Sequence, residues 1–158
     1  MKPTKLWSLA TYLIAAAVFA FVLAHAFVTR GFAVPVSPIN LPITLFLVGI
    51  ALGFLAIPMA RYRKALKEAT KNVKRVPPLY AFRVVVLAKA TSIAGSLFLG
   101  WHLGVLLVQL TLPTITPAIG FSILGATAAL VTTVIAVVVE YLFRIPPDLN
   151  DTIEGTPA

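Results

Sequence analysis

Few residues in this 158-residue chain have side chains that could carry out chemistry. It contains five Asp and Glu residues, two histidines and no cysteine, which excludes a cysteine nucleophile, a thiolate metal site and a disulfide. Lys89 and Glu140 are the notable charges, because each interrupts a long apolar segment. Charged residues inside such segments are rare and usually face a partner or a polar cavity. These two residues are therefore the first candidates for a functional site.

Lys89 and Glu140 are expected to lie at a similar depth in a membrane. Lys89 follows Arg83 by about 9 Å of helix, and Glu140 precedes Arg144 by about 6 Å, at 1.5 Å of rise per residue. Because the two helices should run in opposite directions, we predict an ion pair between these residues. The pair could be structural, fixing which helix faces meet, or it could belong to a path for a proton or another solute.

His25 and His102 form a weaker pair of candidates. Each lies about 28 Å along its helix from the basic start, so both approach the opposite membrane face. Two imidazoles without an acid make a poor metal site, and we expect satisfied histidines at the membrane interface instead. The chain also shows no phosphate loop, nucleophile elbow, paired carboxylates or zinc-protease helix. Neither a cofactor, a bound metal nor enzyme activity is expected.

Four apolar segments must position these residues, and each could cross the hydrocarbon core, which needs about 20 helical residues. The chain is 59% hydrophobic and only 11% charged, with too few charges to cover a water-facing surface. The runs are continuous rather than alternating, which favours helices over strands. The sequence predicts an all-α four-helix transmembrane bundle over residues 1–145, with helices at roughly 6–28, 41–73, 78–112 and 118–144. A mobile cytoplasmic tail is expected at 146–158.

The first helix is expected to be retained rather than cleaved, because the apolar core of a signal peptide is shorter than this segment. Lys2 and Lys5 precede this helix, Arg30 alone follows it, and no Lys or Arg separates the third and fourth helices. Seven basic residues lie between the second and third helices: Arg61, Arg63, Lys64, Lys67, Lys71, Lys74 and Arg75. Lys and Arg near helix ends favour the cytoplasm. Both termini are therefore expected in the cytoplasm, in a multi-pass protein of the plasma membrane.

The basic stretch between the second and third helices has two interpretations. It is either the orientation signal alone, lying near anionic lipid headgroups, or a docking surface for an acidic partner. The net charge of +8 could also indicate nucleic-acid binding. Its placement between apolar segments argues against that function, and the lipid bilayer is the partner that the pattern predicts.

Small residues recur every four positions in two of the segments. The second contains Gly49 and Gly53, and the third contains Ala88, Ser92, Ser96, Gly100 and Gly104. Such spacing lets helices approach closely, and the serines could hydrogen-bond across the contact. Lys89 shares a helical face with Ser96 and Gly100, while Glu140 shares one with Ala129, Thr133 and Ala136. We interpret these faces as packing within the bundle, and contact with a second copy or another membrane protein is the alternative.

Three stretches, MKPTKLWSL, LAKATSIAGSLFLGWHLG and EYLFRIPPD, resemble actinobacterial membrane proteins grouped as the domain-of-unknown-function 3180 family. The resemblance covers nearly the whole chain and implies four helices. Tyr141 stands where a basic residue is often found in that family. The family's activity is not established, so the resemblance implies no mechanism. It implies signature positions at Lys89, Gly95, Glu140, Arg144, Pro146, Pro147 and Asp148.

These observations predict a small integral membrane protein without catalytic activity. The leading expectation is an accessory subunit or scaffold that binds another membrane protein through its membrane faces or its basic stretch. The alternative is a small oligomeric transporter or channel, with Lys89 and Glu140 near its pathway. An enzyme acting on lipid has little support among the residues present.

Overall fold

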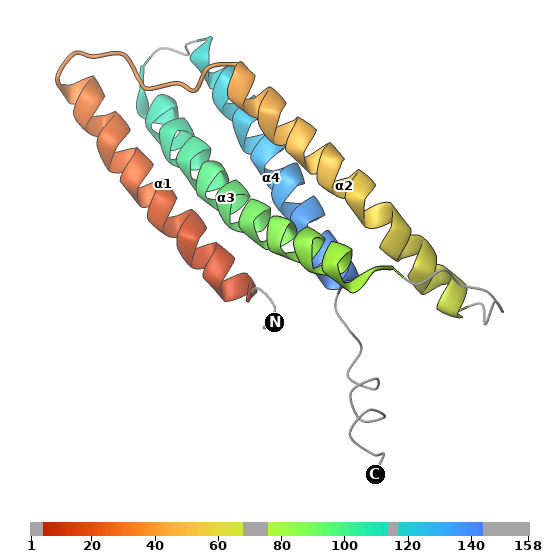
Figure 1. Cartoon of the computed structure of the whole chain (residues 1–158). Helices are drawn as coiled ribbons and strands as arrows, with labels where there is room; N and C mark the ends of the chain where they lie inside the picture. The colour runs from red at the N-terminus through yellow and green to blue at the C-terminus, as the bar shows by residue number, and fades with distance from the viewer. Residues whose placement is uncertain (1–4, 68–75, 114–116, 144–158) are drawn as a thin grey trace.

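The computed structural model consists of four long helices and describes residues 5–67, 76–113 and 117–143 (Figure 1). The helices are α1 (Leu6–Thr29), α2 (Asn40–Lys67), α3 (Pro78–Thr111) and α4 (Ala118–Leu142). All four are long and apolar enough to cross a membrane, as expected of a multi-pass membrane protein. The bounds agree with the sequence prediction to within a few residues, except at the end of α2. The predicted continuation to residue 73 and the predicted tail at 146–158 lie outside the described residues.

The end of α1 shows how local sequence sets a helix boundary. Gly31 follows the helix with a φ of 79°, a conformation that glycine adopts without steric cost. The N–H groups of Gly31 and Phe32 donate to the carbonyls of Val28 and Phe27, both at 3.0 Å. The rings of Phe27 and Phe32 pack 5.9 Å apart. This is the Schellman arrangement, in which glycine lets the chain leave the helix while the last carbonyls stay hydrogen bonded.

The helices pack side by side in the order α1, α3, α4, α2 (Figure 1). Among the described residues α1 contacts α3 alone, and α2 rests mainly on α4. Within the most apolar window of each helix, 44% of α3 is buried but only 11% of α1. The predicted four-helix bundle is therefore an open row with α3 and α4 at its centre.

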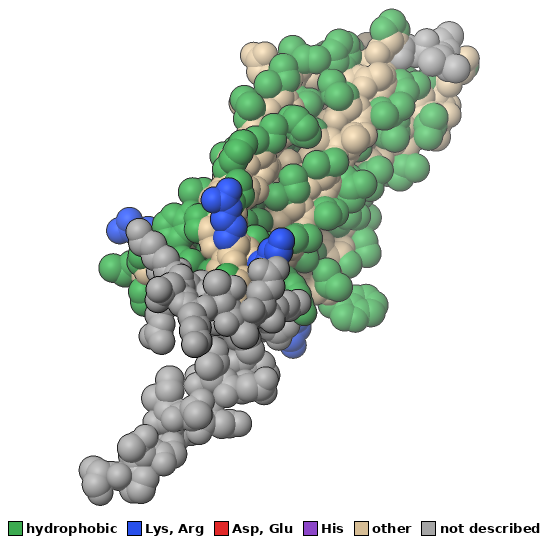
Figure 2. All heavy atoms as spheres, turned by 90° about the vertical axis from the view of Figure 1, so that its right-hand side faces the viewer, with side chains coloured by type: hydrophobic (Ala, Val, Ile, Leu, Met, Phe, Trp, Pro, Cys, Tyr) green, Lys and Arg blue, Asp and Glu red, His purple; other side chains and the backbone are tan. Residues whose placement is uncertain are grey.

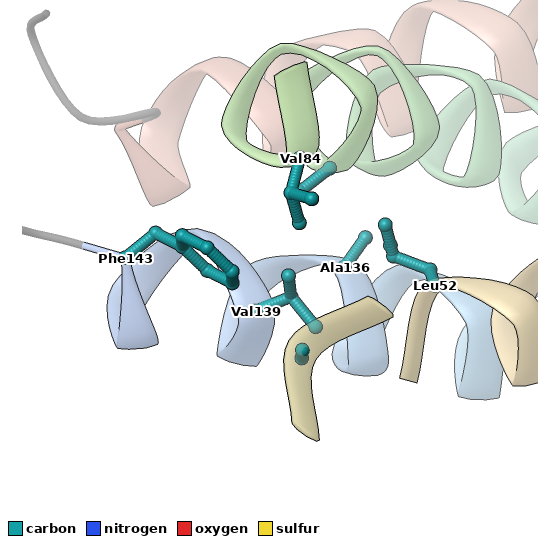
Figure 3. Close-up of a cluster of buried hydrophobic side chains, with 7 residues drawn as sticks. Leu52, Val84, Ala136, Val139 and Phe143 are labelled. Carbon is teal, nitrogen blue, oxygen red and sulfur yellow. The ribbon is translucent and has the colours of Figure 1, made fainter. Parts of the chain in front are cut away.

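Two apolar clusters hold this row together. We call the end where α1 and α3 begin the basic end, because Arg61, Lys64 and Arg83 lie there. The cluster near the basic end joins α2, α3 and α4, and Figure 3 shows Val84 of α3 pointing towards the α4 residues Ala136 and Val139. The other cluster joins α1 to α3 towards the opposite end, through Ala20, Ala24, Val105 and Val108. The contacts between helices are thus made largely by small and β-branched side chains.

Polar contacts also tie α2 to its neighbours. The Thr132 hydroxyl of α4 donates to the carbonyl of Leu45 at 2.9 Å, and the Tyr80 hydroxyl of α3 donates to the carbonyl of Leu55 at 2.7 Å. Leu55 lies three residues before Pro58, which has no N–H and interrupts the hydrogen-bond ladder of α2. The phenol of Tyr80 therefore supports α2 close to its proline.

The outside of the row is apolar. Large side chains are exposed along all four helices, including Trp7 at 84% and Phe54 at 67%. In Figure 2 hydrophobic side chains cover most of one face, while the described Lys and Arg side chains gather towards one end. Such a surface suits hydrocarbon as its solvent, with the charges placed where headgroups begin.

Candidate functional site

Lys89 and Glu140, the predicted ion pair, lie on the two central helices. Both side chains are half-buried. Gly95 of α3 lies against Thr133 of α4 and His102 against Gly125, and counting back along the antiparallel helices puts Lys89 beside residues 138–139, within about two residues of Glu140. The depth match expected from helical rise is therefore present in the fold. The ion pair itself stays a prediction.

The two glycines of the small-residue face of α3 meet α1, whereas Ala88 of the same face belongs to a cluster shared with α4. A side chain at Gly100 would collide with the backbone of Leu13 in α1, and one at Gly104 with the backbone of Ala17. Gly95 is the glycine that lies against Thr133 of α4. By helical phase Lys89 therefore points more towards the α1 side than the sequence argument assumed. Helical spacing alone could not tell which neighbour each face would meet.

The serines of this face were expected to be able to bond across helices, but they bond within α3. Ser92 donates to the carbonyl of Lys89 at 2.9 Å, and Ser96 donates to that of Ile93 at 2.8 Å. Both side chains are buried, and bonding to a carbonyl of their own helix satisfies their hydroxyl donors. Ser92 and Ser96 therefore act as small residues whose hydroxyl groups need no acceptor on a neighbouring helix.

The two glycines of α2 that the sequence predicts as packing positions have different surroundings. A side chain at Gly49 would meet Thr132 of α4 at 3.1 Å, so this glycine is part of the α2–α4 contact. A side chain at Gly53 would meet nothing within 4 Å. Gly53 instead lines an open groove of about 270 Å³ between α2 and α4, which we call the α2–α4 groove. Its walls are apolar and include Ala56, Ile57, Ala60, Val134 and Val138.

A second groove of about 530 Å³ lies between α1, α3 and the segment that joins α1 to α2. Phe19 and Trp101, whose rings are 6.5 Å apart, form part of its wall. The residues at 35–37 cross one side of it. Lys89 and Glu140 line neither groove.

The basic surface predicted after the second helix is described in part. Arg61 and Lys64 are exposed, and the guanidinium of half-buried Arg63 lies 6.0 Å from the ring centre of Tyr141. This contact joins the basic end of α2 to that of α4. Lys67 ends α2, but its side chain is outside the described residues, as are Lys71, Lys74, Arg75, Arg144, Pro146, Pro147 and Asp148.

His102 lies inside the protein, while the expected depth of both histidines at the membrane interface stays a prediction. The side chain of His102 is only 2% exposed, and its ring lies against Gly125 inside the α3–α4 contact. Gln109 and Ser122 are buried in the same half of the molecule. Sequence reasoning passed over these two residues, although the seven-residue spacing of His102 and Gln109 puts them on one helical face. His25, by contrast, is exposed and stacks on Phe21 with ring centres 6.0 Å apart.

Within the described residues no group of three or more His, Asp or Glu side chains could hold a metal ion. In the comparisons with known proteins, a family model described as "Protein of unknown function (DUF3180)" matches residues 9–147. No curated protein and no solved structure matches the chain.

Proposed function

The chain belongs to the DUF3180 family of proteins of unknown function, and we propose from its own surfaces that it is a non-catalytic accessory subunit or scaffold. In this proposal another membrane protein lays a transmembrane helix against the α2–α4 groove. The observation that carries it is the empty space in front of Gly53.

The other glycines within the helices show why this space is informative. Five of the other six, Gly49, Gly95, Gly100, Gly104 and Gly125, each lie against a neighbouring helix of the same chain, and Gly120, in the first turn of α4, faces open space like Gly53. Gly53 has the same kind of surroundings on α2, including Ala56 and Ala60, but no helix covers it. Small residues let transmembrane helices pack closely, and such packing is a main source of association within lipid.

The shape of the α2–α4 groove also favours a helix over a small molecule. Its volume of about 270 Å³ is below the roughly 300–1,000 Å³ typical of small-molecule sites. It is open along its length and almost without polar groups, so it offers little to orient a polar ligand. Apolar side chains of a partner helix could fill it without leaving an unpaired polar group.

The test is to fill the groove and ask whether a partner is lost. We expect the tagged wild-type protein to purify from native membranes in mild detergent with a stoichiometric membrane protein. Gly53→Leu should lose that partner. Gly120→Leu is the matched control and should keep it, because Gly120 also has open space in front of it but lies near the start of α4, outside the α2–α4 groove. A photo-activated cross-linker at Ile57 should attach to the same partner.

Equal recovery of the partner by both variants would rule out the α2–α4 groove as its site. Absence of any stoichiometric partner, together with solute movement by the purified protein in vesicles, would instead support the transporter. That alternative is favoured by one observation: Lys89 and Glu140 are half-buried at the same level of the two central helices.

We further propose that the basic end faces the cytoplasm and that the membrane is the plasma membrane. Lys5, Arg61, Arg63, Lys64 and Arg83 lie towards this end, while Arg30 lies at the other. This asymmetry supports a cytoplasmic basic end by the rule that positive residues remain inside. Anionic headgroups of the inner leaflet would then lie against the basic surface, each cation contributing about 1 kcal/mol.

A further inference from the structure

Three buried polar side chains lie on α3 and α4 in the half of the molecule away from the basic end. His102 and Gln109 are each 2% exposed, and Ser122 is 1% exposed. His102 and Gln109 share one face of α3 and are separated by about 10.5 Å of helical rise. The ring of His102 lies against Gly125, which fixes how α4 is aligned with α3. Because α4 runs the other way, Ser122 lies about one turn beyond His102, towards Gln109.

The hydrogen bonds of this group are incomplete. The Nδ1 atom of His102 lies 2.7 Å from the carbonyl oxygen of Phe98, which can only accept, so Nδ1 carries the proton. In the neutral ring Nε2 is then an acceptor. Neither Nε2 of His102 nor the amide oxygen and nitrogen of Gln109 has a partner among the described residues. The Ser122 hydroxyl is 3.4 Å from the carbonyl of Ala118, close to the limit for a hydrogen bond.

Such a group needs an additional ligand. Buried polar atoms in proteins are almost always hydrogen bonded, and the need is greatest where the surroundings are hydrocarbon. The atoms that await partners are an imidazole acceptor, an amide acceptor and an amide donor, with a weakly held hydroxyl between them. A water molecule can donate two hydrogen bonds and accept two, and buried waters usually have two to four polar partners.

We propose that this part of the α3–α4 contact is a hydration site, in which water bridges His102, Ser122 and Gln109. The water would enter from the far end of α3, because Gln109 lies only two residues before Thr111, where that helix ends. Towards the basic end the contact closes. Ala129 and Ala136 are fully buried there, Gly95 lies against Thr133, and the Thr133 hydroxyl is already bonded to Ala129 at 2.7 Å.

The hydration site would thus reach from the far end of α3 to His102, about 13.5 Å of helical rise before Thr111, and would not continue to the basic end. It goes beyond the proposed accessory role and does not depend on a partner protein. His102 would be the deepest group that water, and with it a proton, can reach from that side.

The two-histidine content of the chain makes the site directly observable, because His25→Gln leaves His102 as the only imidazole. The variant would be labelled with ¹⁵N-histidine, placed in lipid bilayers and studied by solid-state NMR. We expect a protonated Nδ1, a hydrogen-bonded but unprotonated Nε2, and magnetisation transfer from water to the ring that is lost in D₂O. Gln109→Leu should reduce that transfer, and Thr127→Val, an exposed position on α4, should not.

A second measurement uses the absence of cysteine from the chain. Ser122→Cys and Ala129→Cys place thiols seven residues apart on one face of α4, and both native residues are buried. A small water-soluble thiol reagent should modify the Ser122→Cys thiol faster. Equal protection of both thiols, with an Nε2 that has no water contact or is bonded to a protein group, would overturn the proposal.

Discussion

At the scale of single residues, identical side chains take different roles because their neighbours differ. Gly100 is held against the backbone of α1, whereas Gly53 faces open space. Thr132 bonds to α2 through its hydroxyl, but Ser92 bonds to its own helix. The spacing of small residues therefore identifies helix faces that permit close approach, and the neighbour decides whether that approach occurs.

Gly100→Ala and Gly53→Ala form a matched pair that tests this difference. At Gly100 the added methyl group would lie 2.9 Å from the Cβ atom of Ala16 and would press on the backbone of Leu13. Overpacking of this kind costs about 1–3 kcal/mol of unfolding free energy. At Gly53 the methyl group meets nothing, and we expect no loss, or a gain below about 1 kcal/mol from helix propensity. Denaturant titration of both variants in the same micelles measures the difference, and equal losses would contradict it.

At the scale of helices, α3 and α4 form the centre, and α1 is attached through its contact with α3, which is as extensive as that between α3 and α4. The glycines on the α1 side of α3 bring the two backbones together, while between α3 and α4 Gly95 makes room for Thr133 and Gly125 for the ring of His102. These close approaches set the alignment of α4 along α3, which brings Lys89 and Glu140 to one level. A charged pair at that level would reinforce the alignment.

Exchanging the two charges tests whether they interact. Lys89→Glu alone would place two carboxylates at the same level of the α3–α4 contact and should lower the unfolding free energy. We expect Lys89→Glu combined with Glu140→Lys to recover about 0.5–3 kcal/mol, the range of coupling energies between residues in contact.

The matched control is Arg83→Glu combined with Glu140→Lys, because Arg83 is exposed and lies six residues earlier on α3. It should show no such recovery in the same denaturant titration. If the exchange of Lys89 and Glu140 lowered the unfolding free energy by the sum of the losses in the two single variants, the two residues would not form an ion pair.

At the scale of the whole molecule, the open row leaves both edge helices with much of their surface in lipid. α1 has contacts on one side only, and α2 leaves the α2–α4 groove uncovered. A closed bundle would bury these faces, whereas a row keeps them available for another protein. Most of the described Lys and Arg residues lie towards one end of the molecule, and this asymmetry should determine which end faces the cytoplasm.

Single cysteines in this cysteine-free chain test that direction. Ala33 lies between α1 and α2 and is exposed, and Lys64 is exposed near the basic end of α2. In intact cells a membrane-impermeant thiol reagent should modify the Ala33→Cys variant, and should modify Lys64→Cys only after the membrane is opened. The reverse pattern would show that the basic end faces outwards.

The sequence by itself determined the number of helices, their approximate bounds and the membrane as their solvent. These follow from the length and continuity of apolar runs, from prolines and glycines at the boundaries, and from the placement of Lys and Arg, all of which are local properties. Helical rise also placed Lys89 and Glu140 at matching depth, because distance along a helix is fixed by residue count.

Only the tertiary structure decided which faces meet. Helical phase assigned Lys89, Ser96 and Gly100 to one side of α3, but it could not show that Gly100 meets α1 while Gly95 meets α4. It also could not show that His102 is buried against Gly125, since an apolar face looks the same whether lipid or another helix covers it. In a membrane protein the lipid is as apolar as a neighbouring helix, so hydrophobicity alone does not separate the buried side from the lipid-facing side.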